Sequence, residues 1–365
     1  MVVHWFLIAV ADRVYMIYVA RILSGFSIGM ATVTVAPYVG EISLNNIRGR
    51  MIVWQLIMVK CGILFAYVVG NSVSIRDMAC ICLISPCIFF IVVGIWIPES
   101  PYYLIGINEH EKAFKSLSTF RGHQNIQEEF NSIIEMVEIS KNNQASFSDI
   151  FSCKGNRKGV AIVFIIATAQ MMSGSQIIVA YLHTIINNIG SGVETNNISI
   201  IFGIIQIITA FLCGTVVDML GRRPLVLIGC SGVTICNLVI GIYFFLKQYA
   251  IVDVQPISWL PVLAILSFIF FYCLGLSPII ITLLSELLNK NIKGMVIAIY
   301  TLYFAAVSFV MLKLFEIVTQ AMGTHIPFLT FAVSTIVCIP IIWNILPETK
   351  GKSFAAILDI LNNKQ

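Results

Sequence analysis

The stretch Glu41-Ile-Ser-Leu-Asn-Asn-Ile-Arg-Gly49 returns near the other end of the chain as Glu286-Leu-Leu-Asn-Lys-Asn-Ile-Lys-Gly294. In both copies an acidic residue is followed, at the same spacing, by Asn-Ile, a basic residue and glycine, in the middle of very apolar sequence. A second pair, Pro98-Glu-Ser100 and Pro347-Glu-Thr349, repeats at nearly the same offset. The pattern predicts an internal duplication, with two helix bundles that run in the same order through a membrane.

The composition indicates a membrane protein with many spans. Hydrophobic residues make up 58% of the 365 residues and charged residues only 11%, which is more apolar surface than a single soluble core buries. Runs of about 20 apolar residues, the length that crosses a hydrocarbon core as a helix, lie at 15–38, 51–71, 78–97, 159–187, 197–217, 224–246, 258–284, 295–321 and 326–346. We therefore expect an all-α membrane protein with nine full spans.

The apolar stretch Met1–Ala11 is too short to span alone, because a helix of that length reaches only about 16 Å of the roughly 30 Å needed. It also lacks the basic start and the cleavage site of a signal peptide. We interpret it as the end of a partial span. Shifting the second half back by the repeat offset predicts that the first two spans and part of the third are missing from this sequence.

The distribution of lysine and arginine predicts which ends of the spans face the cytoplasm. Basic residues concentrate in four loops and the C-terminal tail, at 40–50, 98–158, 218–223, 286–294 and 347–365. The opposite loops hold only Arg13, Arg76 and Lys247. By the positive-inside rule the basic loops and the C-terminus are predicted to be cytoplasmic. We expect the protein to reside in the plasma membrane. The net charge of +4 reflects this topology, and no basic run predicts a nucleic-acid partner.

The polar and apolar segments predict four parts of the chain. These are an incomplete N-terminal bundle at 1–97 (spans 3–6), a cytoplasmic loop at 98–158, a C-terminal bundle at 159–346 (spans 7–12) and a cytoplasmic tail at 347–365. Within the loop, apolar residues at helical spacing predict short amphipathic helices over Glu109–Lys115 and Gln127–Lys141.

Charged residues cluster at the predicted cytoplasmic ends of the spans. An acid at the end of one span faces a base at the start of the next, as in Glu41 with Arg48, Glu286 with Lys293, and Asp218 with Arg222 and Arg223; Glu99 and Glu348 complete the set. Charge-assisted hydrogen bonds between such groups can form in one packing of the halves and break in the other. We interpret them as a gating network. The alternative is that they only anchor the topology.

Short motifs follow one another along the whole chain: Ala20-Arg-x3-Gly25-x3-Gly29, Pro37-Tyr-x2-Glu41-Ile-Ser43, Pro98-Glu-Ser-Pro101, Gln170-x2-Ser173-Gly174, Asp218-x2-Gly-Arg-Arg-Pro224 and Pro347-Glu-Thr-Lys-Gly351. In this order and spacing they resemble the sugar porter family of the major facilitator superfamily, and most closely the insect facilitated trehalose transporters. The resemblance implies a major facilitator fold of twelve spans, a sugar site near the midplane, and alternating access. The cysteines lack the spacing of metal ligands, and we expect neither a metal nor a cofactor.

Polar side chains inside the spans are the candidates for binding a sugar, because amide and hydroxyl groups pair with sugar hydroxyls and are then tolerable when buried. The candidates are Gln170, Ser173, Gln176, Gln206 and Gln55. Lys60 is a further candidate, since an ionisable group at mid-span normally faces a cavity or a partner.

The chain departs from the family's pattern at several expected sugar contacts. Met171 replaces a second glutamine, Ile281 stands at a tryptophan position, and Phe304-Ala305 replaces Asn-Trp. The leading hypothesis is a facilitative transporter of trehalose or a hexose. Two alternatives stay open: a non-transporting relative that acts as a sensor or is inactive, and a transporter of a non-sugar or anionic small solute.

An enzyme is not expected, because the five histidines are isolated and no catalytic constellation or phosphate-binding loop is present. The expected partners are a small-molecule solute and the lipid bilayer.

Overall fold

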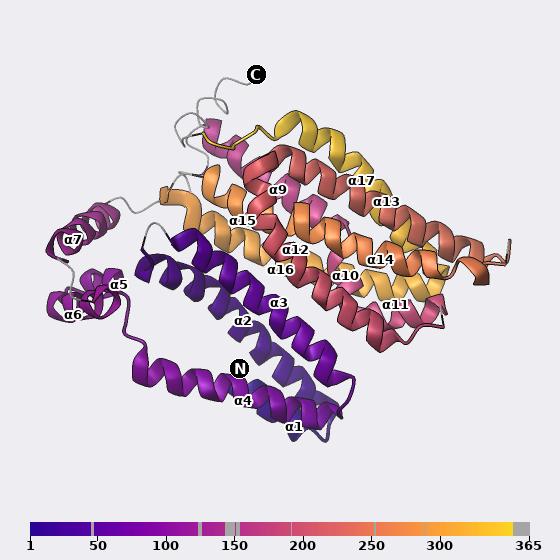
Figure 1. The fold of residues 1–365 in the computed structure, drawn as a ribbon, viewed down its shortest axis with the longest axis horizontal. Helices are drawn as coiled ribbons and strands as arrows, with labels where there is room; N and C mark the ends of the chain where they lie inside the picture. Colours follow the sequence, from indigo (N-terminus) through magenta and orange to yellow (C-terminus); the bar gives the residue numbers. More distant parts are fainter. Residues whose placement is uncertain are drawn as a thin grey trace. The chain divides into compact units, whose positions relative to one another are not determined.

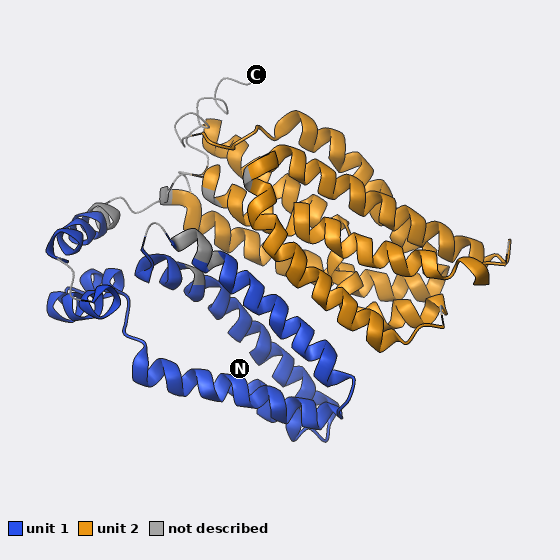
Figure 2. Cartoon of the chain, viewed as in Figure 1, with its two compact units in different colours: residues 1–144 blue, residues 145–365 orange. Residues whose placement is uncertain are grey.

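The computed structural model is built of α-helices and describes residues 1–44, 47–122, 126–142, 150, 154–190, 192–251, 253–288 and 290–352. Nine helices in this described part are long and apolar enough to cross a membrane (Figure 1). They coincide with the nine apolar runs of the sequence, so the prediction of nine full spans is confirmed. Contacts between Cα atoms divide the chain into two compact units, residues 1–144 and residues 145–365 (Figure 2).

The N-terminal unit begins with one short helix, α1 (Val2–Ala9), and three long ones, α2 (Val14–Ile42), α3 (Arg48–Gly70) and α4 (Ile75–Trp96). Helix α1 packs against both α2 and α4. The contact is centred on Ile8 and on two fully buried alanines, Ala20 and Ala79. Small side chains at such positions let helix backbones approach closely, which is the usual way helices associate in a membrane.

Three helices follow in the polar segment: α5 (Pro101–Gly106), α6 (His110–Arg121) and α7 (Gln127–Asn142). The two amphipathic helices expected there are present, and their apolar faces form a small core that includes Leu117, Phe130 and Ile133. Arg121 joins this core to the end of α2. Its guanidinium forms an ion pair with Glu129, 2.8 Å between Nη2 and Oε1, and donates from Nη1 to the Ile42 carbonyl at 2.8 Å.

The C-terminal unit holds the other helices of the described residues. In chain order they are α9 (Lys154–Met172), α10 (Ser175–Ala180), α11 (Leu182–Ile189), α12 (Thr195–Leu220), α13 (Arg222–Gln248), η1 (Gln255–Ile257), α14 (Trp259–Phe271), η2 (Tyr272–Leu276), α15 (Ser277–Glu286), α16 (Lys290–Met322) and α17 (His325–Ile345). Helix α13 is the centre of this unit and packs against α14, η2 and α17.

Two of the apolar runs are not single α-helices. The run predicted at 159–187 is divided into α9, α10 and α11, and the run at 258–284 contains the π-helical turn η2 between α14 and α15. A π-helical turn inserts an extra residue into the helix and re-aims the side chains around it. Hydropathy cannot reveal either interruption, because the residues on both sides are equally apolar.

Helix α13 crosses η2 at backbone contact, and two glycines make this possible. A Cβ atom placed on Gly275 would lie 2.5 Å from the Leu225 carbonyl oxygen and 2.6 Å from Gly229 Cα. No side chain fits there without separating the two helices. The crossing therefore fixes the position of η2, and with it the position of Tyr272 at the start of that turn.

We expect Gly275→Val to destabilise the C-terminal unit, because the added side chain overpacks the crossing at a typical cost of about 1–3 kcal/mol. In a unit of this size that lowers the midpoint of thermal unfolding by roughly 2–12 °C. The buried thiols of Cys213 and Cys230 allow the transition to be followed with a thiol-reactive fluorophore. Gly214→Val is the matched control, because nothing lies within 4 Å of a Cβ at Gly214. Equal midpoints for the two variants would contradict the close crossing.

Candidate functional site

The break between α9 and α10 is built by Ser173 and Gly174. Gly174 has φ +78°, and a Cβ at this position would lie 2.4 Å from the Phe331 ring, so both the backbone conformation and the packing require glycine. The Ser173 hydroxyl donates back to the Gln170 carbonyl oxygen at 2.6 Å. The break turns a single span into two helices and leaves backbone groups that need other partners.

Asn237, a fully buried residue of α13, supplies one of these partners. Its Nδ2 donates to the Ser173 carbonyl at 3.0 Å. Its Oδ1 has no hydrogen-bond partner among the described residues. One turn away, the Thr234 hydroxyl donates to the Thr335 hydroxyl at 2.7 Å, so α13 carries a polar strip toward both α9 and α17.

Gln170 lies at the end of α9, with its side-chain amide between two tyrosines from distant parts of the chain. Its Nε2 donates to the Tyr272 hydroxyl oxygen at 2.9 Å, and the Tyr300 hydroxyl donates to its Oε1 at 3.5 Å. Gln170 and Tyr272 are buried, whereas Tyr300 is half-buried. The amide therefore has partners on both its nitrogen and its oxygen.

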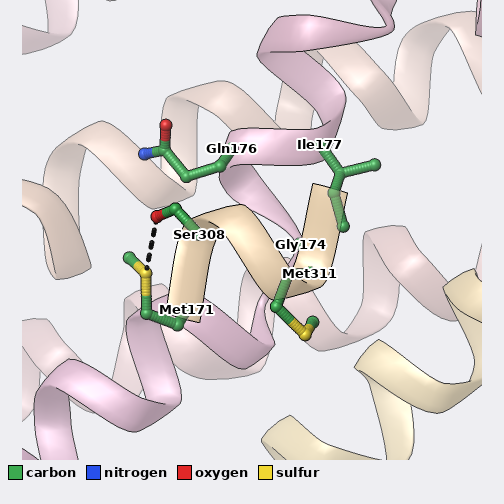
Figure 3. A pocket seen from close by; sticks show the side chains of 6 residues that line it. All are labelled: Met171, Gly174, Gln176, Ile177, Ser308 and Met311. Atoms are coloured by element: carbon green, nitrogen blue, oxygen red, sulfur yellow. Dashed lines mark hydrogen bonds between the residues drawn. The ribbon is translucent and has the colours of Figure 1, made fainter. Parts of the chain in front are cut away.

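A second contact between α9 and α16 lies beside the first. The hydroxyls of Thr168 and Tyr303 are 2.7 Å apart, and the Ser308 hydroxyl contacts the Met171 sulfur at 3.4 Å. Figure 3 shows this last contact at a small hollow whose lining also includes Gly174, Gln176, Ile177 and Met311. The space between these side chains is too small for a water molecule.

The other polar residues predicted to bind a sugar are placed differently. Gln176 is half-buried on α10 at the rim of the hollow, and Gln206 is buried on α12 with its Nε2 unpaired within the described part of the chain. Gln55 and Lys60 are half-buried on α3, in the other unit. The structure thus gathers Gln170, Ser173 and Gln176 around one helix break. That these three residues and Gln206, Gln55 and Lys60 bind a sugar stays a prediction.

The charged residues of the C-terminal unit form a compact cluster at the end of α15. The Arg222 guanidinium lies 2.9 Å from Glu286 Oε1, and the Thr349 hydroxyl donates to Glu286 Oε2 at 2.6 Å. The expected pair of Glu286 with Lys293 is therefore wrong, since Lys293 forms no ion pair with any described residue. A guanidinium offers several donors in one plane and suits a carboxylate better than a single ammonium does.

Glu348 holds the first turn of α13. Its two carboxylate oxygens each accept a backbone N–H, from Arg222 and from Arg223, at 3.0 Å. A carboxylate at a helix N-terminus satisfies unpaired N–H groups and interacts favourably with the helix dipole. Burial alone would raise the pKa of Glu348, but the N–H groups of Lys350, Arg222, Arg223 and Thr349 outweigh it and hold that pKa below its ordinary value.

The N-terminal unit repeats part of this cluster. The Ser100 hydroxyl donates to Glu41 Oε2, as Thr349 donates to Glu286 in the other unit, so the duplicated sequence forms a duplicated contact. Nearby, the Tyr38 hydroxyl donates to the Pro98 carbonyl at 2.7 Å. Glu99, the counterpart of Glu348, is exposed. The predicted partners Arg48 and Asp218 have side chains that lie outside the described residues.

Several residues at these sites were missed from the sequence, among them Asn237, Tyr272, Tyr300, Tyr303 and Thr349. Tyrosines inside apolar spans read as packing residues, and nothing local distinguishes those whose hydroxyls meet a glutamine. Thr349 carried a usable signal, because it follows the repeated Pro-Glu pair at the same place as Ser100.

A family model described as "Sugar (and other) transporter" matches residues 1–360. The chain belongs to this family. The match confirms the expected transporter in place of an enzyme, and with the nine spans it makes this family member a multi-pass membrane protein.

Similar proteins agree with this assignment. The "Facilitated trehalose transporter Tret1" of Culex quinquefasciatus is 29% identical over 359 residues, covering 98% of this chain and 69% of the relative. The protein of the same description from Aedes aegypti is 28% identical, and the chain spans 44% of its length. The major facilitator superfamily proton:xylose symporter XylE has a TM-score of 0.73 at 20% identity, covering 99% of this chain and 82% of XylE. This likeness shows the major facilitator fold.

We expect Glu348→Gln to lower the stability of the C-terminal unit by about 1–2 kcal/mol. This is less than the roughly 1.5–3 kcal/mol typical of hydrogen bonds to charged groups, because the carboxylate is partly exposed. The amide keeps only one acceptor oxygen for the two N–H groups. The folded pKa is lowered, so the carboxylate stabilises the fold above the unfolded pKa of about 4.3, and the effect is lost as the pH falls through the folded value.

Thermal unfolding of both proteins between pH 7 and pH 3 tests this expectation. The difference between wild type and Glu348→Gln should shrink toward pH 3, whereas the exposed Glu128→Gln control on α7 should match wild type throughout. A difference that stays constant with pH would show that the charge of Glu348 is not what stabilises α13.

Proposed function

We propose that this protein is a facilitative transporter of a neutral sugar, trehalose or a hexose, that works by alternating access. The observation that carries the proposal is the set of uncharged polar groups around Gln170 inside an otherwise apolar helix bundle. Two phenols and an amide in hydrogen-bonding reach of one another provide both donors and acceptors, which a hydroxyl-rich solute needs. Burying them is costly unless they have a polar function or partner.

The chemistry of this set favours a neutral solute over an anion. The hydrogen-bonding side chains on the facing parts of α9, η2 and α16 are amide, hydroxyl and phenol groups, and none of them carries a charge. The trehalose transporters among its relatives support trehalose as the first sugar to test. Small organic anions are included in the uptake test because Lys60, on α3, carries a basic side chain.

The charge cluster around Glu286 is proposed as a gate latch on the cytoplasmic side of the plasma membrane. It joins the end of α15, the start of α13 and the segment after α17 through side-chain contacts and through the backbone N–H groups that Glu348 accepts. Such contacts can break and re-form without unfolding any helix. The positive-inside distribution of basic residues supports the cytoplasmic orientation.

Uptake of labelled sugars by cells that express the chain tests the transport proposal. We expect saturable uptake of trehalose or glucose and none of small organic anions. Gln170→Ala should reduce uptake about twofold to twelvefold, because a neutral hydrogen bond contributes about 0.5–1.5 kcal/mol. Gln127→Ala, an exposed glutamine on α7, is the control and should leave uptake unchanged. Uptake of anions alone would favour the alternative substrate class.

We expect Glu286→Lys to open the proposed latch, because it places two positive charges together at Arg222. A cysteine introduced at Ser308 reports the change through its labelling rate with a thiol reagent applied from the cytoplasmic side. The rate should rise severalfold over the Ser308→Cys protein alone. Glu194→Lys, a charge reversal in the loop before α12, is the control. A rate that stays unchanged in Glu286→Lys would contradict the latch.

A further inference from the structure

Tyr300 and Tyr303 lie one turn apart on α16, and both hydroxyls reach α9. Residues three positions apart share one face of a helix, so the two phenols form a pair beside Gln170 and Thr168. Both tyrosines are half-buried, whereas Gln170 is only 4% exposed. The two phenols are therefore more exposed than the amide that they flank.

The partner of the Tyr300 hydroxyl decides whether that hydroxyl donates or accepts the hydrogen bond between them. Gln170 Oε1 can only accept a hydrogen bond, so the Tyr300 hydroxyl must donate its single proton to it. The Gln170 amide in turn donates a hydrogen bond from Nε2 to the Tyr272 hydroxyl oxygen at 2.9 Å. The Tyr300 oxygen is left with lone pairs and no proton to give.

The Tyr303 hydroxyl is also a hydrogen-bond donor to α9, for a different reason. The Thr168 hydroxyl already donates its proton to the Phe164 carbonyl oxygen at 2.8 Å. With the Thr168 proton on that carbonyl oxygen, the 2.7 Å contact between Thr168 and Tyr303, in which either hydroxyl can donate, becomes a bond in which Tyr303 donates. Both phenol oxygens consequently offer only acceptor positions to any further partner.

We propose that Tyr300 and Tyr303 are specificity-determining residues that accept hydrogen bonds from two hydroxyl groups of the transported sugar. Gln170 and Thr168 are positioning residues that fix the direction of the phenol protons. The inference rests on the proposed sugar transport. It names a recognition chemistry, solute hydroxyls acting as donors, that neither the family match nor the relatives specify for these positions.

Aromatic surface accompanies the two acceptors. The rings of Tyr300 and Phe304 are 6.0 Å apart, and those of Phe164 and Tyr303 are 5.4 Å apart. Binding sites for small molecules are typically lined by aromatic groups with a few polar atoms that fix orientation. The Phe304 ring, which stands where the family pattern has an asparagine, then belongs to the same recognition surface.

Deoxy and deoxyfluoro sugars separate a donor from an acceptor. A deoxy sugar lacks the hydroxyl, and a deoxyfluoro sugar can accept but has no proton to donate. Binding of labelled trehalose and glucose to the purified full chain in lipid nanodiscs, competed by monodeoxy and monodeoxyfluoro glucoses, gives the affinity at each ring position. For the wild type, we expect the deoxyfluoro analogue to bind as weakly as the deoxy analogue at two ring positions.

Tyr300→Phe and Tyr303→Phe should each weaken sugar binding about twofold to twelvefold, the range for one neutral hydrogen bond. In each variant, the deoxy analogue at one of those two ring positions should bind with the same affinity as the sugar that keeps the hydroxyl. Tyr243→Phe is the matched control. Its buried hydroxyl donates to the Ile189 carbonyl at 3.1 Å, so it loses a comparable bond away from α9 and α16 and should keep the wild-type profile.

Unchanged affinity and an unchanged analogue profile in both variants, with sugar bound by the wild type, would overturn the inference and leave transport standing. Weaker binding with an unchanged profile would also overturn it, since the phenols would then only hold α16 against α9. A wild-type protein that binds no sugar in nanodiscs and takes up none in cells would overturn the proposed function and this inference together.

Discussion

The rule that every backbone polar group must find a partner inside the hydrocarbon core governs this molecule, because no water is available there to replace a lost hydrogen bond. Long uninterrupted helices meet the rule by themselves. The break at Ser173 and Gly174 does not, and the structure meets the rule there with side chains: the Ser173 hydroxyl on the Gln170 carbonyl, and Asn237 on the Ser173 carbonyl. The interruption that creates the candidate site is thus supported by a neighbouring helix.

The glycine contact between α13 and η2 has a related consequence. Because Gly229 and Gly275 bring the two backbones together, the π-helical turn is held where Tyr272 reaches Gln170 from one side. Tyr300 on α16 reaches the same amide from the other. At the end of α15, away from this amide, Glu286 and Glu348 connect α13, α15 and the segment after α17. The bundle therefore has a neutral polar seam in its interior and a charged cluster at one end, which suits a solute site and a gate respectively.

Much of the architecture could be predicted from the sequence. Hydropathy located all nine spans, because a helix that crosses a membrane needs a length of apolar residues that few other structures require. The duplicated Glu-x4-Asn-Ile motif indicated two related halves, and the structure shows Glu41 with Ser100 and Glu286 with Thr349 in equivalent contacts. The pairing of Glu286 with Lys293 was wrong, because residues close in the chain were taken as partners and the guanidinium comes from 64 positions earlier.

The sequence by itself determined the class of protein, the number of spans, the repeat and the family, because these depend on composition and on the order of motifs along the chain. Only the tertiary structure decided which polar groups meet. Gln170, Tyr272 and Tyr300 come from three separate helical segments, and the direction of each hydroxyl proton depends on what its neighbour can accept. Such relations are properties of packing in three dimensions, and no local pattern of residues encodes them.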